Sequence, residues 1–197
     1  YPDDAQIDVA LLALGDLHAR QQQYEKAQTY YRALLQRFPG SPRRTAGAFG
    51  LGVVLYALQD YPGSLTAFQE SITNSQQYWG AAHAYLGEIA VRQKRYSDAI
   101  APLKIATEAG KDAALMERAR SLMANTIQTH LPLAELETLS AQYPAVYPGD
   151  LLLQRLAQEY RRAGNFKDEL TALQRFTARF PGHPETATAA QRAKALE

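Results

Sequence analysis

The chain has 197 residues, a formal net charge of +1 and 21% charged side chains, so no strong electrostatic field favours nucleic acid or an anionic membrane surface. It contains no cysteine, which excludes disulfides and thiolate chemistry, and no apolar run reaches the ~18 residues needed to span a bilayer. The length suits one ordinary globular domain or one solenoid of repeated units.

A small residue followed nine positions later by an aromatic residue recurs along the chain. The pairs are Gly15 and Tyr24, Gly52 and Tyr61, Gly87 and Tyr96, and Ala157 and Phe166. The aromatic residues lie 37, 35 and then 70 positions apart, and 70 is two periods of 35. A period of about 34 residues is typical of a helical solenoid, in which each unit stacks on its neighbour.

The first unit spans residues 8–41. In each half of the unit, residues three or four positions apart would line one side of a helix: Leu11, Leu14 and His18 in the first half, and Ala27, Tyr31 and Leu34 in the second. This spacing predicts two amphipathic helices. A glycine inside a helix costs about 1 kcal/mol relative to alanine, so repeated glycines indicate that the second helix approaches closely. We expect small residues of the two helices to face each other, with the aromatic residue filling the space beside them.

The residues before the first unit resemble the end of another unit. Tyr1-Pro2-Asp3-Asp4 looks like the tail of a preceding unit, comparable to Phe38-Pro39, so we expect the chain to be a fragment of a longer protein.

In the second unit, residues 45–78, the segment 46–58 is apolar on every face. A helix of this kind is buried on all sides unless one face takes a ligand. Phe49 and Tyr56 are therefore either packing between repeats or part of an aromatic groove for a peptide or partner helix.

The remaining units are predicted at residues 80–113, 114–146 and 150–183. The unit at 114–146 is degenerate, because Arg120 falls where the leading glycine should be, and we expect a looser or re-angled helix pair there. Residues 185–196 form a short amphipathic pattern that predicts a helix capping the end of the stack.

No constellation of residues indicates catalysis, a cofactor or a metal site. The four histidines are scattered and none has a ligand spacing such as His-Glu-x-x-His. His83 is predicted to be a core histidine beside Trp79. The run from Gly47 to Gly52 has the wrong glycine order for a dinucleotide-binding loop, and no strand precedes it. The chain is therefore predicted not to be an enzyme.

These positions resemble the tetratricopeptide repeat family, whose signature is a bulky residue, Leu-Gly, an aromatic residue, alanine, a second aromatic residue and proline at fixed spacing. The copies that carry the resemblance are residues 8–41, 45–78, 80–113 and 150–183. The resemblance implies one domain over residues 1–197. Its fold would be an all-α, right-handed superhelical solenoid of antiparallel helix pairs, with about five repeats and a C-terminal capping helix.

In this family the first helices of successive units line a concave surface that binds a protein or peptide. The register places these residues on it: Leu12, Asp16, Phe49, Val53, Tyr56, Ala84, Tyr85, Glu88, Gln154, Gln158 and Arg161. Members that hold the C-terminal carboxylate of cytosolic chaperones use Lys, Asn and Arg at inner positions. The matching positions here are Leu12, Asp16, Gly50, Ala81 and Tyr85, so we do not expect that class of partner.

The linkers Phe-Pro-Gly-Ser-Pro and Phe-Pro-Gly-His-Pro look like those of bacterial cell-envelope members. Together with the divergent fourth unit they are most similar to the N-terminal domain of penicillin-binding-protein activators, which are lipoproteins. The resemblance implies a non-catalytic protein-interaction scaffold that is periplasmic or outer-membrane-associated, with the cytoplasm as the other location. We expect no nucleic-acid partner, no cofactor and no membrane insertion. An accessory domain of a larger enzyme or solute-binding protein, and a homo-oligomerisation module, remain as alternatives.

Overall fold

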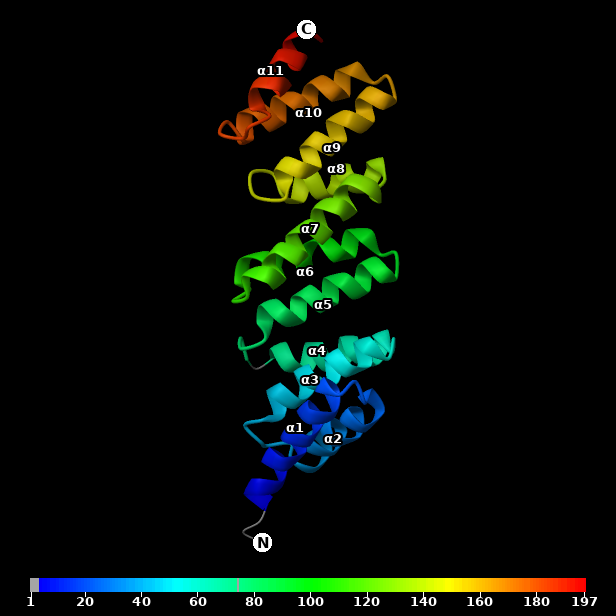
Figure 1. The fold of residues 1–197 in the computed structure, drawn as a ribbon. Coiled ribbons are helices and arrows are strands. Elements are labelled where there is room, and N and C mark those ends of the chain that lie inside the picture. The colour runs from blue at the N-terminus through cyan, green and yellow to red at the C-terminus, as the bar shows by residue number, and fades with distance from the viewer. Residues whose placement is uncertain (1–3, 74) are drawn as a thin grey trace.

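The computed structural model describes residues 4–73 and 75–197, which form eleven α-helices and no strand. Of the tail predicted at Tyr1-Pro2-Asp3-Asp4, the first three residues lie outside the described residues, and Asp4 begins α1. The helices are α1 (Asp4–Arg20), α2 (Tyr24–Arg37), α3 (Arg44–Ala57), α4 (Tyr61–Thr73), α5 (Trp79–Arg92), α6 (Tyr96–Ala109), α7 (Ala113–Thr129), α8 (Leu133–Gln142), α9 (Gly149–Arg162), α10 (Phe166–Arg179) and α11 (Thr186–Lys194). They stack in chain order from α1 and α2 at one end to α10 and α11 at the other (Figure 1). The predicted all-α solenoid of helix pairs is confirmed.

Three kinds of helix contact build the stack. Each odd-numbered helix packs on the even-numbered helix that follows it in α1–α2, α3–α4, α5–α6 and α9–α10. Each even helix from α2 to α8 also packs on the next odd helix, as α2 does on α3. The odd helices from α1 to α9 contact one another in sequence. They therefore share one side of the stack, which we name the odd-helix face.

One glycine in each of the first three odd helices is wedged against a bulky side chain of the even partner helix. A Cβ atom added at these positions would lie 2.5–2.7 Å from a side-chain carbon of the partner helix: Gly15 against Tyr31, Gly52 against Phe68, and Gly87 against Leu103. The expectation that small residues face only small residues was therefore incomplete. Ser64 does lie against Gly52, whose carbonyl accepts a hydrogen bond from Ser64 Oγ at 2.8 Å.

The aromatic residue at the start of each second helix is only partly buried in the first three units. Tyr24, Tyr61 and Tyr96 are half-buried, whereas Phe166 is 53% exposed. Phe166 does not fill the space assigned to it, so the packing role predicted for this position was wrong in the fifth unit.

Helix α3 is apolar on every face, and its neighbours α2 and α4 cover most of it. Gly47 faces Leu34 of α2, and Gly52 faces Phe68 of α4. Its side chains at Val54 and Leu55 are buried. Most of the apolar segment 46–58 is therefore core, and Phe49, Val53 and Tyr56 remain partly exposed.

The fourth helix pair is looser than the others. Helices α7 and α8 lack the close backbone contact that joins the partners of the other pairs, and α8 packs mainly on α9. Arg120, at the glycine position, points outward, and its guanidinium lies 5.8 Å from the centre of the Tyr147 ring. Arginine cannot replace the glycine that, in the other units, makes room for a bulky side chain of the second helix. This accounts for the looser contact between α7 and α8.

Helix α11 caps the C-terminal end of the stack by packing on α10. Ala189 and Ala193 are buried in this contact. Glu169 occupies the position held by alanine or serine in earlier units, and it is fully buried. Its carboxylate accepts hydrogen bonds from Arg161 Nε of α9 at 2.7 Å and from Arg192 Nε of α11 at 2.9 Å. These contacts lower the pKa of Glu169, with the Arg192 hydrogen bond as the largest cause.

None of the helices in residues 4–73 and 75–197 combines the length and the apolar character needed to cross a membrane.

Candidate partner-binding surface

The side chains predicted to form the binding groove all lie on odd helices. Leu12 and Asp16 belong to α1, Phe49, Val53 and Tyr56 to α3, Tyr85 and Glu88 to α5, and Arg161 to α9. Each of these eight side chains is at least partly exposed to solvent, as are Gln154 and Gln158 of α9, whereas Ala84 of α5 is buried. The structure divides them among three separate places on the stack.

The first place is a hollow between α1 and α3, which we name the α1–α3 hollow. It is lined by Leu12, Asp16, Ala19, Arg20, Tyr31, Ala46, Phe49, Gly50, Val53 and Tyr78. Four of the eleven residues predicted on this surface therefore converge there. Gly50 keeps the floor open, because a Cβ atom at this position would lie 2.5 Å from the Tyr31 ring.

The hollow has an aromatic wall and a carboxylate at its edge. The Phe49 ring stacks on Tyr78 with centroids 4.4 Å apart and planes at 11°. Tyr31 donates a hydrogen bond to Asp16 Oδ1 at 2.7 Å. Burial, followed by this hydrogen bond, raises the pKa of Tyr31 far above its ordinary value, so the phenol remains a neutral donor that holds the Asp16 carboxylate in place.

Aromatic rings continue from this hollow to α5. The Tyr85 ring stacks on buried Phe68 with centroids 5.0 Å apart. It also makes edge contacts with Phe49 at 6.4 Å and with Tyr56 at 5.2 Å. The rings of Tyr78, Phe49, Tyr85 and Tyr56 therefore form a connected series across α3 and α5. Aromatic side chains of this kind are frequent anchors of protein interfaces.

The second place is a charged cluster centred on Glu88. Tyr56 donates a hydrogen bond to Glu88 Oε1 at 2.5 Å, and Arg92 Nε donates one to the Tyr56 oxygen at 2.7 Å. Arg92 also pairs with Glu88 at 3.2 Å, and Arg118 of α7 pairs with the other carboxylate oxygen. Two guanidinium groups and one carboxylate leave a net charge of +1 on the cluster. Burial and the Glu88 hydrogen bond raise the pKa of Tyr56 to about 12.

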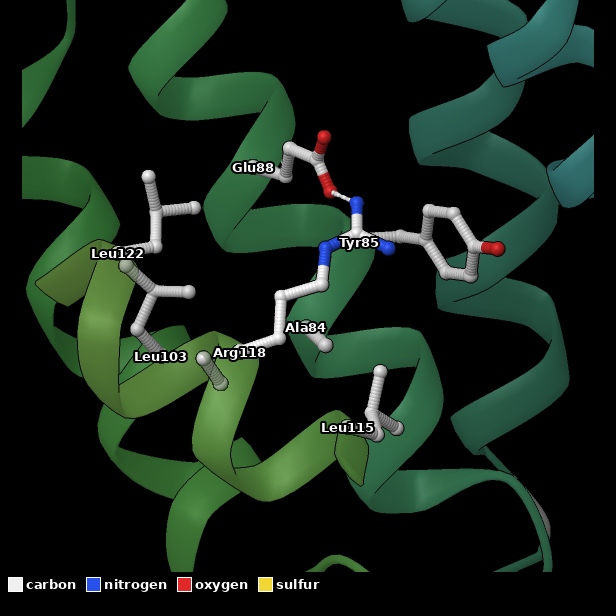
Figure 2. Close-up of a pocket in the computed structure, with 8 residues that line it drawn as sticks. Ala84, Tyr85, Glu88, Leu103, Leu115, Arg118 and Leu122 are labelled. Carbon is white, nitrogen blue, oxygen red and sulfur yellow. Dashed lines mark hydrogen bonds and ion pairs between the residues drawn. The ribbon is translucent and has the colours of Figure 1, made fainter. Parts of the chain in front are cut away.

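Figure 2 shows the Arg118 side chain extending from α7 to Glu88, with Tyr85 on its other side. The pocket beside it has an apolar lining from Ala84, Leu103, Leu115, Ala119 and Leu122. The Arg118 side chain is 58% exposed, so its ion pair with Glu88 is of the solvent-screened kind that contributes little to stability. The guanidinium can therefore exchange Glu88 for another carboxylate at small cost.

The third place holds Arg161, which the structure does not bring to the aromatic series. It lines a different hollow with Gln154 and Gln158, which were predicted on the same surface, and with residues of α10 and α11. It is also paired with Glu169 at 2.7 Å. The observed contact of Arg161 is thus with the C-terminal cap.

The sequence prediction missed several residues of these three places, among them Tyr78, Arg118 and Arg92. Tyr78 precedes α5 outside the helical register, so no periodic signal marks it. Arg118 occupies the α7 position equivalent to Tyr85, two residues before the glycine position, and the same register could have found it. Arg92 lies one helical turn after Glu88, a spacing at which opposite charges meet.

The histidine on α5 lies in the core. His83 is buried, as predicted: its Nδ1 lies 2.8 Å from the Trp79 carbonyl oxygen and its ring centroid 4.5 Å from that of Trp79. Burial lowers the pKa of His83. Among residues 4–73 and 75–197, no group of three or more His, Cys, Asp or Glu side chains is placed to hold a metal ion.

Comparison with known families agrees with this architecture. The sequence model of a family described as tetratricopeptide repeat matches residues 12–78, which run from α1 to the end of the second unit. This stretch holds the helices that form the α1–α3 hollow. Residues 12–78 are tetratricopeptide repeats. The helix pairs beyond them continue the tetratricopeptide-like solenoid. No curated protein matches the chain.

Tetratricopeptide repeats generally mediate protein–protein interaction, and the family is typically a non-catalytic scaffold. The odd-helix face of this chain therefore belongs to an architecture whose members bind other proteins.

Proposed function

We propose that the odd-helix face binds a segment of another protein, with the α1–α3 hollow as the main anchor. The observation that carries the proposal is the convergence of Leu12, Asp16, Phe49 and Val53 around one open hollow with an aromatic wall. Partly exposed aromatic and aliphatic side chains on a soluble domain mark interaction surfaces. The extended surface of a solenoid suits an extended peptide or an amphipathic helix.

The charge pattern supports a polar partner segment with apolar anchors. Asp16 supplies a carboxylate beside the hollow, whereas the Glu88 cluster carries a net charge of +1 farther along the same face. A segment with an apolar side chain for the hollow and an acidic residue toward Arg118 would satisfy both. Such complementarity contributes mainly to specificity and to the rate of association.

We place this binding in a bacterial cell-envelope assembly, at the periplasm or the outer membrane. The support is the similarity of the linkers at Phe38 and Phe180 to those of envelope members of the family. An accessory role beside a catalytic or solute-binding domain uses the same face, so it changes the partner and not the surface.

A blocking substitution with a matched control tests the proposal. Val53→Arg places a long cation in the α1–α3 hollow, and Val146→Arg makes the same change at a valine that is 53% exposed away from the hollow. Each immobilised protein is incubated with bacterial envelope extract, and the captured proteins are quantified by mass spectrometry. Proteins captured by the parent and by Val146→Arg should be lost from Val53→Arg.

Circular dichroism and thermal melting establish that the Val53→Arg protein is folded before capture is compared. A photo-crosslinking amino acid at Val53 gives a second measurement that needs no loss of binding, with one at exposed Gln174 as its control. Equal capture by all three proteins, together with no crosslink specific to position 53, would show that the hollow is not the binding site.

A further inference from the structure

A second hollow on the odd-helix face repeats the position of the α1–α3 hollow farther along the stack. Gly15 and Ala157 lie 142 positions apart, as do the first residues of α3 and α11, Arg44 and Thr186. Helices α9 and α11 are therefore the counterparts of α1 and α3, and we name the space between them the α9–α11 hollow. Six of its lining residues occupy the register positions of six that line the α1–α3 hollow: Gln154, Gln158, Arg161, Leu173, Thr188 and Arg192.

The two hollows differ in chemistry because three small residues are replaced together. The replacements are Ala19 by Arg161, Ala27 by Glu169, and Gly50 by Arg192. The α9–α11 hollow has a volume of about 360 Å³, and buried Leu153, Leu173 and Phe176 give it apolar lining. Two guanidinium groups line it as well, where the α1–α3 hollow has small side chains.

The buried carboxylate of Glu169 needs only one of these two arginines. Arg192 binds both of its oxygens, through Nε at 2.9 Å and through Nη2 at 3.0 Å, and such a bidentate pair is the strong form of this contact. Arg161 adds one bond from Nε at 2.7 Å, and within the described part of the chain its side chain donates no other. Its two terminal NH2 groups are therefore available, on a side chain that is 52% exposed. Two guanidinium groups on one carboxylate leave a net charge of +1.

The other polar groups of the hollow suit a peptide that carries a carboxylate. Glu185 also lines the hollow, but it is exposed just before α11, where solvent and salt screen its charge. Gln154 and Gln158 each offer an amide that can both donate to and accept from a peptide backbone. They also line a neighbouring hollow between α7 and α9. An extended segment can therefore continue across α9 on either side of a side chain held by Arg161.

We propose that the α9–α11 hollow binds an aspartate or glutamate side chain within a segment of a partner protein, with Arg161 as the main donor. The proposal rests on the proposed function of the odd-helix face and assigns to that face a second site of different chemistry. The α1–α3 hollow selects an apolar side chain beside the Asp16 carboxylate, whereas the α9–α11 hollow selects a carboxylate. Arg192 holds Glu169 in both the free and the bound protein, so the site is formed before the partner binds.

Acetylated and amidated peptides of varied sequence test the proposal, because their only carboxylates are side chains. They are screened against the parent, Arg161→Gln and the control Arg179→Gln, which removes the same charge at the exposed end of α10. Peptides held in the hollow should bind Arg161→Gln about tenfold more weakly and Arg179→Gln as they bind the parent. Changing one Asp or Glu of such a peptide to its amide should cause the same loss with the parent and no further loss with Arg161→Gln. Thermal melting checks that Arg161→Gln keeps α11 in place, as expected because Arg192 still pairs with Glu169.

A second pair of variants places a carboxylate in the hollow without changing Glu169 or its partners. Gln158→Glu should compete with acidic peptides for Arg161 and weaken their binding, whereas Gln174→Glu at an exposed position of α10 should not. Acidic peptides that bind the parent, Arg161→Gln and Gln158→Glu equally would overturn the proposal, as would a screen in which no acidic peptide binds the parent. Val53→Arg distinguishes the two hollows: if it retains every peptide while Arg161→Gln loses the acidic ones, the α1–α3 hollow is excluded and the α9–α11 hollow is supported.

Discussion

Replacing Gly52 by leucine tests the contact that builds the repeat. A Cβ atom at position 52 would lie 2.7 Å from both Cδ1 and Cε1 of Phe68, and Phe68 is completely buried, so the ring has no free space into which to move. Overpacking of a well-packed core costs typically about 1–3 kcal/mol, and a whole leucine side chain belongs at the upper end. The better helix propensity of leucine returns about 1 kcal/mol. The net loss in the free energy of unfolding is therefore about 2 kcal/mol.

For a chain of this size a loss of about 2 kcal/mol lowers the melting temperature by about 4–8 °C. Thermal melting followed by circular dichroism measures it, with Gly182→Leu as the control because no atom lies within 4 Å of a Cβ atom at that position. Adding Phe68→Ala to Gly52→Leu should recover part of the loss, since the leucine then fills the space of the ring. If the melting temperature of Gly52→Leu equals that of the parent and of Gly182→Leu, the close contact between Gly52 and Phe68 does not contribute to stability as argued.

The C-terminal cap gives two further predictions. Deleting residues 185–197 removes α11 from α10 and exposes the face that holds Phe176, which is 1% exposed, so the truncated chain should elute as larger species in size-exclusion chromatography, and a monodisperse monomer with the parent melting temperature would contradict this. Glu169→Gln should lower stability at neutral pH: because the folded pKa of Glu169 is depressed below 4.5, its contribution is present above that value and disappears as pH falls through the folded pKa. Urea unfolding should therefore show a difference between parent and variant at pH 7 that shrinks in strongly acidic buffer, and a difference independent of pH would exclude the ionised carboxylate as its source.

The architecture and part of the site could be predicted from the sequence, because both depend on the repeat register. The register locates the glycine wedges, and through them it places Leu12, Asp16, Phe49 and Val53 on one side of α1 and α3. The hollow that joins them depends on side chains in even helices and loops. Tyr31 lies over Gly50, and Tyr78 stacks on Phe49 from a segment outside the helical period, so periodicity alone could not show the hollow.

The register alone could not predict the pairing of Arg161 with Glu169. The position of Arg161 on α9 corresponds to the odd-helix face, but a buried glutamate replaces the small residue expected in α10. Glu169 then draws Arg161 and Arg192 to itself, because a buried carboxylate must be paired with cations. The exception at Glu169 was visible in the sequence, and its consequence for Arg161 required the position of α11.

The wedges and the hollow are physically connected. Gly15, Gly52 and Gly87 hold the first three helix pairs at short distances, and the loose pair α7–α8 comes only after them. Tyr31, the side chain wedged against Gly15, also lies over Gly50 and donates its hydrogen bond to Asp16, so one ring sets both the helix spacing and the edge of the hollow. A surface that is fixed before the partner arrives loses less conformational entropy on binding. Because these close contacts fix the spacing of the first three helix pairs, the proposed binding of a partner to the odd-helix face between α1 and α5 needs little rearrangement of the solenoid itself.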